Sequence, residues 1–182
     1  MRLAISGSHA TGKSTLAGEL RSALTDYTFV DEAYAYLLDE GHELGAEPTL
    51  EDFAAQLRRS VSLILEIDGP NVIFDRCPVD YLAYLAALHA DGDELRDSLM
   101  ASVDALRTLN AVIFVPVEAR DRIPVHREDL PKLRNRVDLV LRDMLVDDGW
   151  DLKLNTIQVH GSPSDRAQQL LRWLNAGDAF AR

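Results

Sequence analysis

Short apolar segments alternate with helical patterns along the whole sequence, and this alternation limits the fold more than any other feature. Continuous apolar runs of this kind are typical of parallel strands that are buried on both faces. Strands that alternate with helices form one parallel sheet covered by helices on both sides. The sequence therefore predicts a three-layer α/β protein with about five parallel strands, at Arg2–Ser6, Thr28–Val30, Asn71–Phe74, Ala111–Val115 and Thr156–Val159.

The segments between these strands carry the i, i+3, i+4 spacing of apolar residues that is typical of amphipathic helices. The last of them opens with Ser162 as N-cap and Pro163 at its first position. The others are expected after the first strand and at Ala33–Asp39, Leu50–Leu65, Val79–Ala90, Glu94–Leu109 and Leu133–Leu145. A chain of 182 residues can bury a core of its own, and we expect residues 1–182 to form a single domain.

The charge and cysteine content exclude several classes of protein. There are 19 basic and 30 acidic residues, for a net charge of −11. Such a chain repels a phosphate backbone, so we expect no nucleic-acid partner. The only cysteine, Cys77, cannot form an internal disulfide. No apolar run reaches the ~20 residues of a membrane span, and the N-terminus does not resemble a signal peptide. We therefore expect a cytoplasmic protein without membrane contacts.

A glycine-rich segment follows the first strand. Residues 7–15 fit the pattern G-x-x-x-x-G-K-[ST], which is the P-loop or Walker A motif. A strand precedes the motif and a helical pattern follows it, which is the context that the motif requires. The sequence therefore predicts a nucleotide phosphate site formed by Gly7, Ser8, His9, Ala10, Thr11, Gly12, Lys13, Ser14 and Thr15.

The residue types of the P-loop have separate expected roles. Gly7 and Gly12 allow the backbone to turn so that its N–H groups, with the positive end of the next helix, bind the α- and β-phosphates. Lys13 can reach the β- and γ-phosphates, and the Ser14 hydroxyl can ligate Mg²⁺. ATP and Mg²⁺ are therefore the expected cofactors. His9 is interpreted as a loop residue and not as a catalyst.

Two adjacent acids, Asp31 and Glu32, follow the second strand. Ligands of parallel sheets bind beyond the carboxyl ends of the strands, so both acids are expected near the substrate. One of them, preferably Glu32, could accept a proton from a substrate hydroxyl, as a phosphoryl acceptor requires. The alternative is that Asp31 caps a helix and Glu32 lies in its first turn.

An acid and an arginine, Asp75 and Arg76, follow the third strand. Asp75 occupies the place of a Walker B acid, which binds Mg²⁺ or its waters. Arg76 can bind a phosphate or a reacting oxygen through two N–H groups. The alternative is a buried structural network of these two residues. Asp80 either caps the next helix or contacts Arg76 on the substrate side, and either Glu32 or Asp75 could be the catalytic base.

Basic residues are concentrated between positions 120 and 142. Phosphoryl transfer needs positive charge over the γ-phosphate and exclusion of water, and a lid that carries arginines supplies both. We therefore expect a helical lid at about 118–147, in which Arg122 and Arg127 bind the nucleotide and Arg122 stabilises the transferred group. The alternative is an exposed helix with i, i+4 ion pairs, which we prefer for Arg134, Arg136 and Arg142.

The loop after the last strand reads Gly161-Ser162-Pro163. Its backbone groups are expected to contact the nucleotide base. The alternative is that these residues only cap the final helix.

Together these segments resemble the AAA-domain group of P-loop kinases, typified by the ribosylnicotinamide kinase half of a bacterial NAD-biosynthesis regulator. This group is similar to the nucleoside and nucleotide kinase superfamily, and the resemblance covers nearly the whole chain. It is carried by the P-loop and by Val-Asp-Glu-Ala at 30–33, Asp-Arg-Cys-Pro-Val-Asp-Tyr-Leu-Ala-Tyr at 75–84 and Val-His-Gly-Ser-Pro at 159–163.

The resemblance implies a five-stranded parallel sheet, ATP with Mg²⁺, and transfer of the γ-phosphate to a hydroxyl of a small molecule. It implies that Glu32 is the acceptor-side base, that Arg122 is a lid arginine and that Gln56 is a substrate-side glutamine. Many relatives carry an arginine where this chain has Ala35. The acceptor is therefore not assigned, and nicotinamide riboside is one candidate.

Two classes of function are consistent with these motifs. The first is an ATP-dependent small-molecule kinase with a nucleoside-like or similar acceptor. The second is a regulatory ATPase or nucleotide switch without such an acceptor. The sequence lacks the N-K-x-D motif of GTPases and the L-S-G-G-Q motif of ABC proteins, which disfavours the second class. The acidic charge disfavours a third option, a polynucleotide 5′-kinase.

Overall fold

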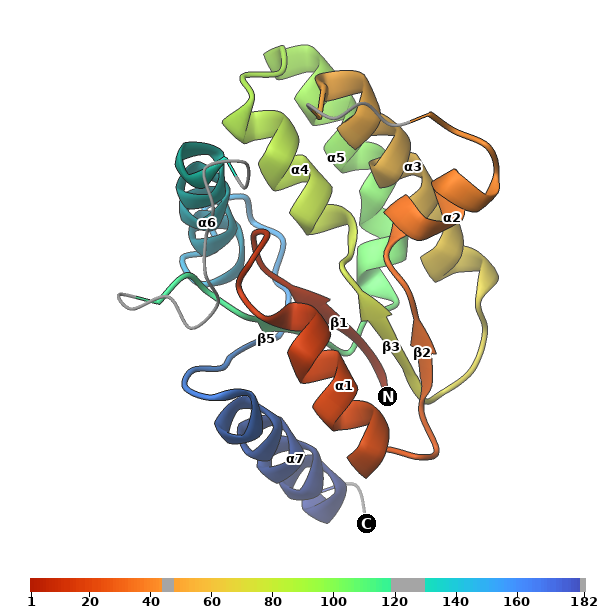
Figure 1. Ribbon diagram of the computed structural model, residues 1–182, viewed down its shortest axis with the longest axis vertical. Helices are drawn as coiled ribbons and strands as arrows, with labels where there is room; N and C mark the ends of the chain where they lie inside the picture. The colour runs from red at the N-terminus through yellow and green to blue at the C-terminus, as the bar shows by residue number, and fades with distance from the viewer. Residues whose placement is uncertain (44–47, 119–129, 181–182) are drawn as a thin grey trace.

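A parallel five-stranded sheet lies at the centre of the protein (Figure 1). The computed structural model describes residues 1–43, 48–118 and 130–180. The strands are β1 (Arg2–Ser6), β2 (Thr28–Val30), β3 (Val72–Asp75), β4 (Ala111–Phe114) and β5 (Thr156–Gln158). They are all parallel and lie in the order β2-β3-β1-β4-β5. The predicted α/β sheet is therefore confirmed.

Helices cover both faces of the sheet, as the continuous apolar strands predict. In Figure 1, α1 and α7 lie on one face, and α3, α4, α5 and α6 lie on the other. The helices are α1 (Lys13–Ala23), α2 (Ala33–Asp39), α3 (Leu50–Glu66), α4 (Pro78–Ala87), α5 (Gly92–Arg107), α6 (Pro131–Leu145) and α7 (Pro163–Phe180). None of the helices in the described ranges combines the length and apolar character that a bilayer crossing needs.

Successive side chains of the central strand β1 point into two separate apolar clusters. Leu3 and Ile5 pack with residues of α1 and α7, whereas Ala4 packs with residues of α3 to α6. All three side chains are fully buried. This alternation explains why the strand contains no charged residue after Arg2: both of its faces are covered.

Some helix ends differ from the sequence prediction. Helix α4 ends at Ala87 and not at Ala90, because His89 takes a left-handed conformation with φ of 62°. Helix α6 ends at Leu145, as predicted, and begins at Pro131, two residues before the predicted start. The alternative role for Asp31 is wrong, because Glu32 and not Asp31 is the N-cap residue of α2.

The ends of β1, β2 and β3 bring distant segments of the sequence together. Residues of β1 pair in register with those of β3, so that Ile5 lies beside Asp75. Residues of β2 pair with the other side of β3, where Val30 lies beside Phe74. The P-loop, Glu32 and Asp75 therefore emerge at one edge of the sheet, where ligands of such folds bind.

Candidate active site

The P-loop has the tight backbone that its glycines allow. Gly7 has φ of +154° and Gly12 has φ of +92°. A Cβ atom at Gly7 would collide with the carbonyl oxygen of Val115. Gly12 is also the N-cap of α1, so the loop leads directly into the first turn of that helix. The start of α1 therefore faces whatever the loop encloses.

Cationic side chains hold consecutive carbonyl oxygens of the P-loop. The hydrogen bonds are Arg76 Nη1 to Gly7 O (3.0 Å), Lys13 Nζ to Ser8 O (2.6 Å), Arg134 Nε to His9 O (3.0 Å), Arg134 Nη2 to Ala10 O (3.3 Å) and Arg166 Nη1 to Thr11 O (2.6 Å). Hydrogen bonds with a charged donor are stronger than neutral ones. The loop is therefore fixed by its own Lys13 and by three arginines from other parts of the fold.

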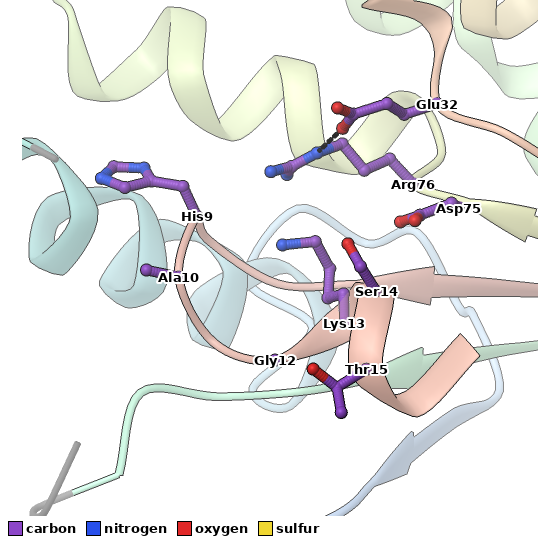
Figure 2. A pocket seen from close by; sticks show the side chains of 9 residues that line it. All are labelled: His9, Ala10, Gly12, Lys13, Ser14, Thr15, Glu32, Asp75 and Arg76. Atoms are coloured by element: carbon purple, nitrogen blue, oxygen red, sulfur yellow. Dashed lines mark hydrogen bonds and ion pairs between the residues drawn. The ribbon is translucent and has the colours of Figure 1, made fainter. Parts of the chain in front are cut away.

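A cavity of about 190 Å³ opens beside the loop (Figure 2). Its volume is below the ~300 Å³ at which typical ligand pockets start, so it accommodates part of a nucleotide, such as the phosphates. In Figure 2, the side chains of Lys13 and Ser14 point from the start of α1 toward the ends of β2 and β3. The described lining residues are His9, Ala10, Gly12, Lys13, Ser14, Thr15, Glu32, Asp75 and Arg76.

Lys13 is buried in the cavity wall with only 6% of its surface exposed. The pKa of its amine is lowered from the ordinary value of 10.5 to about 7, first by burial and then by the charge of the nearby Arg76 guanidinium. The carboxylates of Asp80, Asp75 and Glu32 act in the opposite direction. An incoming polyphosphate would favour the charged amine.

The lowered pKa of Lys13 predicts a pH-dependent stability. Between about pH 7 and pH 10.5, the unfolded chain binds more protons at this residue than the folded protein, so the free energy of unfolding rises with pH. We expect the wild type to gain about 2 kcal/mol between pH 7 and about pH 9 relative to a Lys13→Met variant. Urea unfolding at both pH values measures this difference. Parallel pH profiles of the two proteins would contradict the assignment.

Glu32 and Arg76 form an ion pair at the far end of the cavity. Arg76 Nε donates to Glu32 Oε2 at 2.9 Å. Arg76 has φ of 69°, a conformation that is uncommon for a residue with a side chain and clusters at functional sites. The Glu32 side chain is 38% exposed, whereas that of Arg76 is 10% exposed. The carboxylate therefore remains accessible while the guanidinium is held.

Asp80 holds Arg76 and the P-loop from behind. Its side chain is fully buried, and its Oδ1 accepts from the Gly7 N–H at 2.9 Å and from Arg76 Nη1 at 3.3 Å. Its Oδ2 accepts from the Cys77 N–H at 3.0 Å, and this hydrogen bond is part of the capping box at the start of α4. Both roles considered for Asp80, the cap and the partner of Arg76, are therefore present.

Asp75 lines the same cavity and has an unused oxygen. Its Oδ1 is buried and has no hydrogen-bond partner among the described residues. Burial raises the pKa of this carboxyl, and the charges of Lys13 and Arg76 oppose that rise. A buried carboxylate oxygen without a partner is costly. A ligand that supplies positive charge would therefore be stabilised at this point.

Several predicted site residues are not among the described lining residues of the cavity. The Asp31 side chain is 70% exposed and forms an ion pair with Arg21 at 3.0 Å. Gln56 is buried on α3, where its Nε2 donates to Asp52 O at 3.3 Å. The Gly161 N–H donates to Glu118 Oε1 at 2.8 Å, at the loop of Gly161, Ser162 and Pro163.

The predicted lid region is only partly described. Arg122 and Arg127 lie outside the described residues, and their roles stay predictions. The part that forms α6 packs its apolar side chains, including Val137 and Leu141, into the core beside α4.

Arg134 and Arg166 are site residues that the sequence interpretation missed. The expectation of an exposed Arg134 is wrong: it is 4% exposed and donates to the P-loop. Arg166 is also 4% exposed. Nothing in the local sequence distinguishes them from surface arginines on amphipathic helices. By contrast, Arg142 forms the expected i, i+4 pair with Asp138 at 3.0 Å.

A parallel sheet of this strand order, with a P-loop after its central strand, defines a P-loop protein with a nucleoside and nucleotide kinase-like fold. Residues 2–166 match the family described as AAA domain, and the chain belongs to this family. Its P-loop domain is a nucleotide-binding domain. No curated protein matches the chain.

Solved structures of kinases share this fold. Thymidylate kinase from Candida albicans matches with a TM-score of 0.67 and 15% identity, over 97% of this chain and 92% of that chain. Deoxyadenosine kinase from M. mycoides with bound dATP matches with a TM-score of 0.68 and 15% identity, over 96% and 99%. The NadR protein in complex with NR matches with a TM-score of 0.65 and 17% identity, over 88% of this chain and 44% of that chain.

Proposed function

We propose that this protein is an ATP-dependent kinase that transfers the γ-phosphate to a hydroxyl of a small, nucleoside-like molecule. One observation carries the proposal: a single cavity is lined by the P-loop with Lys13 on one side and by Glu32, Asp75 and Arg76 on the other. Phosphoryl transfer needs a cradle for the donor phosphates, positive charge at the γ-phosphate and an acid that orients the acceptor. The cavity contains side chains suited to each of these tasks.

Ser14 and Asp75 fit a magnesium site that the nucleotide completes. Ser14 is exposed at the start of α1, and the unused Oδ1 of Asp75 lies in the same cavity wall. Within the described part of the chain, no cluster of three or more His, Cys, Asp or Glu residues could hold a metal ion alone. Mg²⁺ at phosphate sites typically has one or two protein ligands, with phosphate oxygens and waters supplying the rest. When bound, the ion would neutralise charge on the β- and γ-phosphates.

Glu32 is the better candidate for the acceptor-side base. Its carboxylate is 38% exposed and is oriented by Arg76, whereas the Oδ1 atom of Asp75 is buried. In the proposed step, the acceptor hydroxyl gives its proton to Glu32 and its oxygen forms the new bond to the γ-phosphorus. The bond from that phosphorus to the bridging oxygen breaks, and ADP leaves. Lys13 and Arg76 stabilise the negative charge of the transferred group.

The similar structures suggest which acceptors should be tested first. Two of the similar structures are named as a thymidylate kinase and a deoxyadenosine kinase, and a third was solved with NR. Ala35 stands where many relatives of the resembled group carry an arginine. The acceptor panel therefore starts from deoxynucleosides, nucleoside monophosphates and nicotinamide riboside and extends to sugars and other polyols.

The test is product formation from each acceptor with Mg-ATP. We expect at least one acceptor to yield a phosphorylated product, detected by mass spectrometry, at a rate well above ATP hydrolysis in its absence. Hydrolysis alone across the whole panel, with stimulation by a protein partner, would contradict the proposal and would favour the regulatory ATPase.

A further inference from the structure

We propose that Arg134 and Arg166 are positioning residues for nucleotide binding, because they orient three consecutive P-loop peptides so that their N–H groups face the phosphate cavity. This inference rests on the proposed binding of ATP by the P-loop. Arg134 is located on α6 and Arg166 on α7, far along the sequence from the loop that they contact. Neither is expected to touch the nucleotide itself.

The two guanidinium groups are buried against the loop carbonyls. Arg134 donates to His9 O at 3.0 Å and to Ala10 O at 3.3 Å, and Arg166 donates to Thr11 O at 2.6 Å. Arg166 is also paired with Glu118 at 2.9 Å. Each arginine is 4% exposed. Burying a charge is costly unless strong partners are supplied, so these contacts define where the loop carbonyls lie.

The direction of each carbonyl also fixes the direction of the next residue's N–H group, because the peptide bond is planar. The described chain contains no cis peptide bond. In a trans peptide, the N–H of one residue points opposite to the carbonyl of the residue before it. Carbonyls 9, 10 and 11 that point toward the arginines therefore turn the N–H groups of Ala10, Thr11 and Gly12 away from them. Ala10 and Gly12 line the cavity, whereas the two arginines are not among its described lining residues.

The preceding peptide has the opposite orientation and serves as an internal comparison. The Ser8 carbonyl accepts from Lys13, a residue that lines the cavity. Accordingly, the His9 N–H donates to the Tyr84 hydroxyl at 3.1 Å and is not available to a phosphate. The orientation of the peptide groups changes between the Ser8 carbonyl, which accepts from Lys13, and the His9 carbonyl, which is the first to accept from Arg134. Successive N–H groups that converge in this way form an anion-binding concavity.

The inference predicts a specific loss in phosphate affinity when Arg134 is replaced. An Arg134→Gln variant should bind pyrophosphate and ADP roughly tenfold to hundredfold more weakly than the wild type, because a charge-assisted hydrogen bond contributes ~1.5–3 kcal/mol. Isothermal titration calorimetry measures both affinities. The matched control is Arg142→Gln on the same helix, which loses its contacts to Asp138 and Val117 O but not a P-loop contact. Its affinities should equal those of the wild type.

An Arg134→Lys variant separates orientation from charge. A lysine keeps the positive charge but cannot donate to both carbonyls in the fixed geometry of a guanidinium, so it should restore only part of the affinity. Faster hydrogen exchange at the N–H groups of Ala10, Thr11 and Gly12 should accompany the loss. If Arg134→Gln does not fold, Arg134→Lys still tests the inference through both readouts.

The outcomes distinguish this inference from the proposed function. If the wild type binds pyrophosphate and Arg134→Gln binds it with the same affinity, the positioning role is overturned. The kinase proposal is left intact by that result. Full restoration by lysine would also overturn it, since charge alone would then explain the effect. A wild type that binds neither pyrophosphate nor ADP would overturn both proposals.

Discussion

Replacing Lys13 with methionine should reduce phosphoryl transfer at least about a hundredfold, the scale found when one stabilising donor is removed from a preorganised site. Lys13 is the only lysine in the described cavity lining, and it lies at the start of α1 beside Ser14. Methionine retains an apolar stem of similar length but cannot stabilise the charge on the β- and γ-phosphates. Steady-state turnover of Mg-ATP with a productive acceptor measures the effect.

A Lys132→Met variant is the control for the loss of a lysine charge. Lys132 is exposed on α6, so its replacement should leave turnover within about twofold of the wild type, as is typical of surface positions. Equal turnover of Lys13→Met and the wild type would contradict the assignment of residues 7–15 as the phosphate cradle.

Replacing Glu32 with glutamine should lower kcat by about 10²- to 10⁴-fold, the usual contribution of a general base. Glutamine has nearly the same shape and can still accept a hydrogen bond from Arg76, so the KM for ATP should change little. The comparison of kcat and KM by steady-state kinetics therefore separates proton transfer from nucleotide binding.

The neighbouring acid supplies the matched control for this experiment. Asp31→Asn removes a carboxylate next to Glu32, but that carboxylate is 70% exposed and pairs with Arg21. Its kcat should therefore remain close to that of the wild type. A normal kcat in Glu32→Gln, with a large loss in Asp75→Asn, would instead identify Asp75 as the base.

Local sequence patterns predicted the elements of the fold well, for a physical reason. The bounds of β2 and α2 agree with the prediction at both ends. Strands covered on both faces must be apolar throughout, and amphipathic helices must repeat their apolar residues every three or four positions. The bounds of β3, β4 and β5 differ from the prediction by one residue. Larger errors fall at helix ends such as that of α4, where His89 adopts a left-handed conformation without a glycine to mark it.

The local sequence also identified the residues that line the cavity, because a P-loop and the acids after parallel strands must meet at one edge of the sheet. It placed Asp31 and Glu32 near the substrate and preferred Glu32 as the base. In the structure, Glu32 lines the cavity and pairs with Arg76, whereas Asp31 is exposed and pairs with Arg21.

By itself, the sequence determined the α/β layering, the phosphate-binding loop and the charged residues at the strand ends, because each of these depends on short-range spacing. Only the tertiary structure decided which buried groups support that loop: Asp80, Arg134 and Arg166. Their partners are backbone atoms of the P-loop at distant positions in the chain. Backbone amides and carbonyls are identical at every residue, so no side-chain pattern records which of them a remote arginine or aspartate will meet.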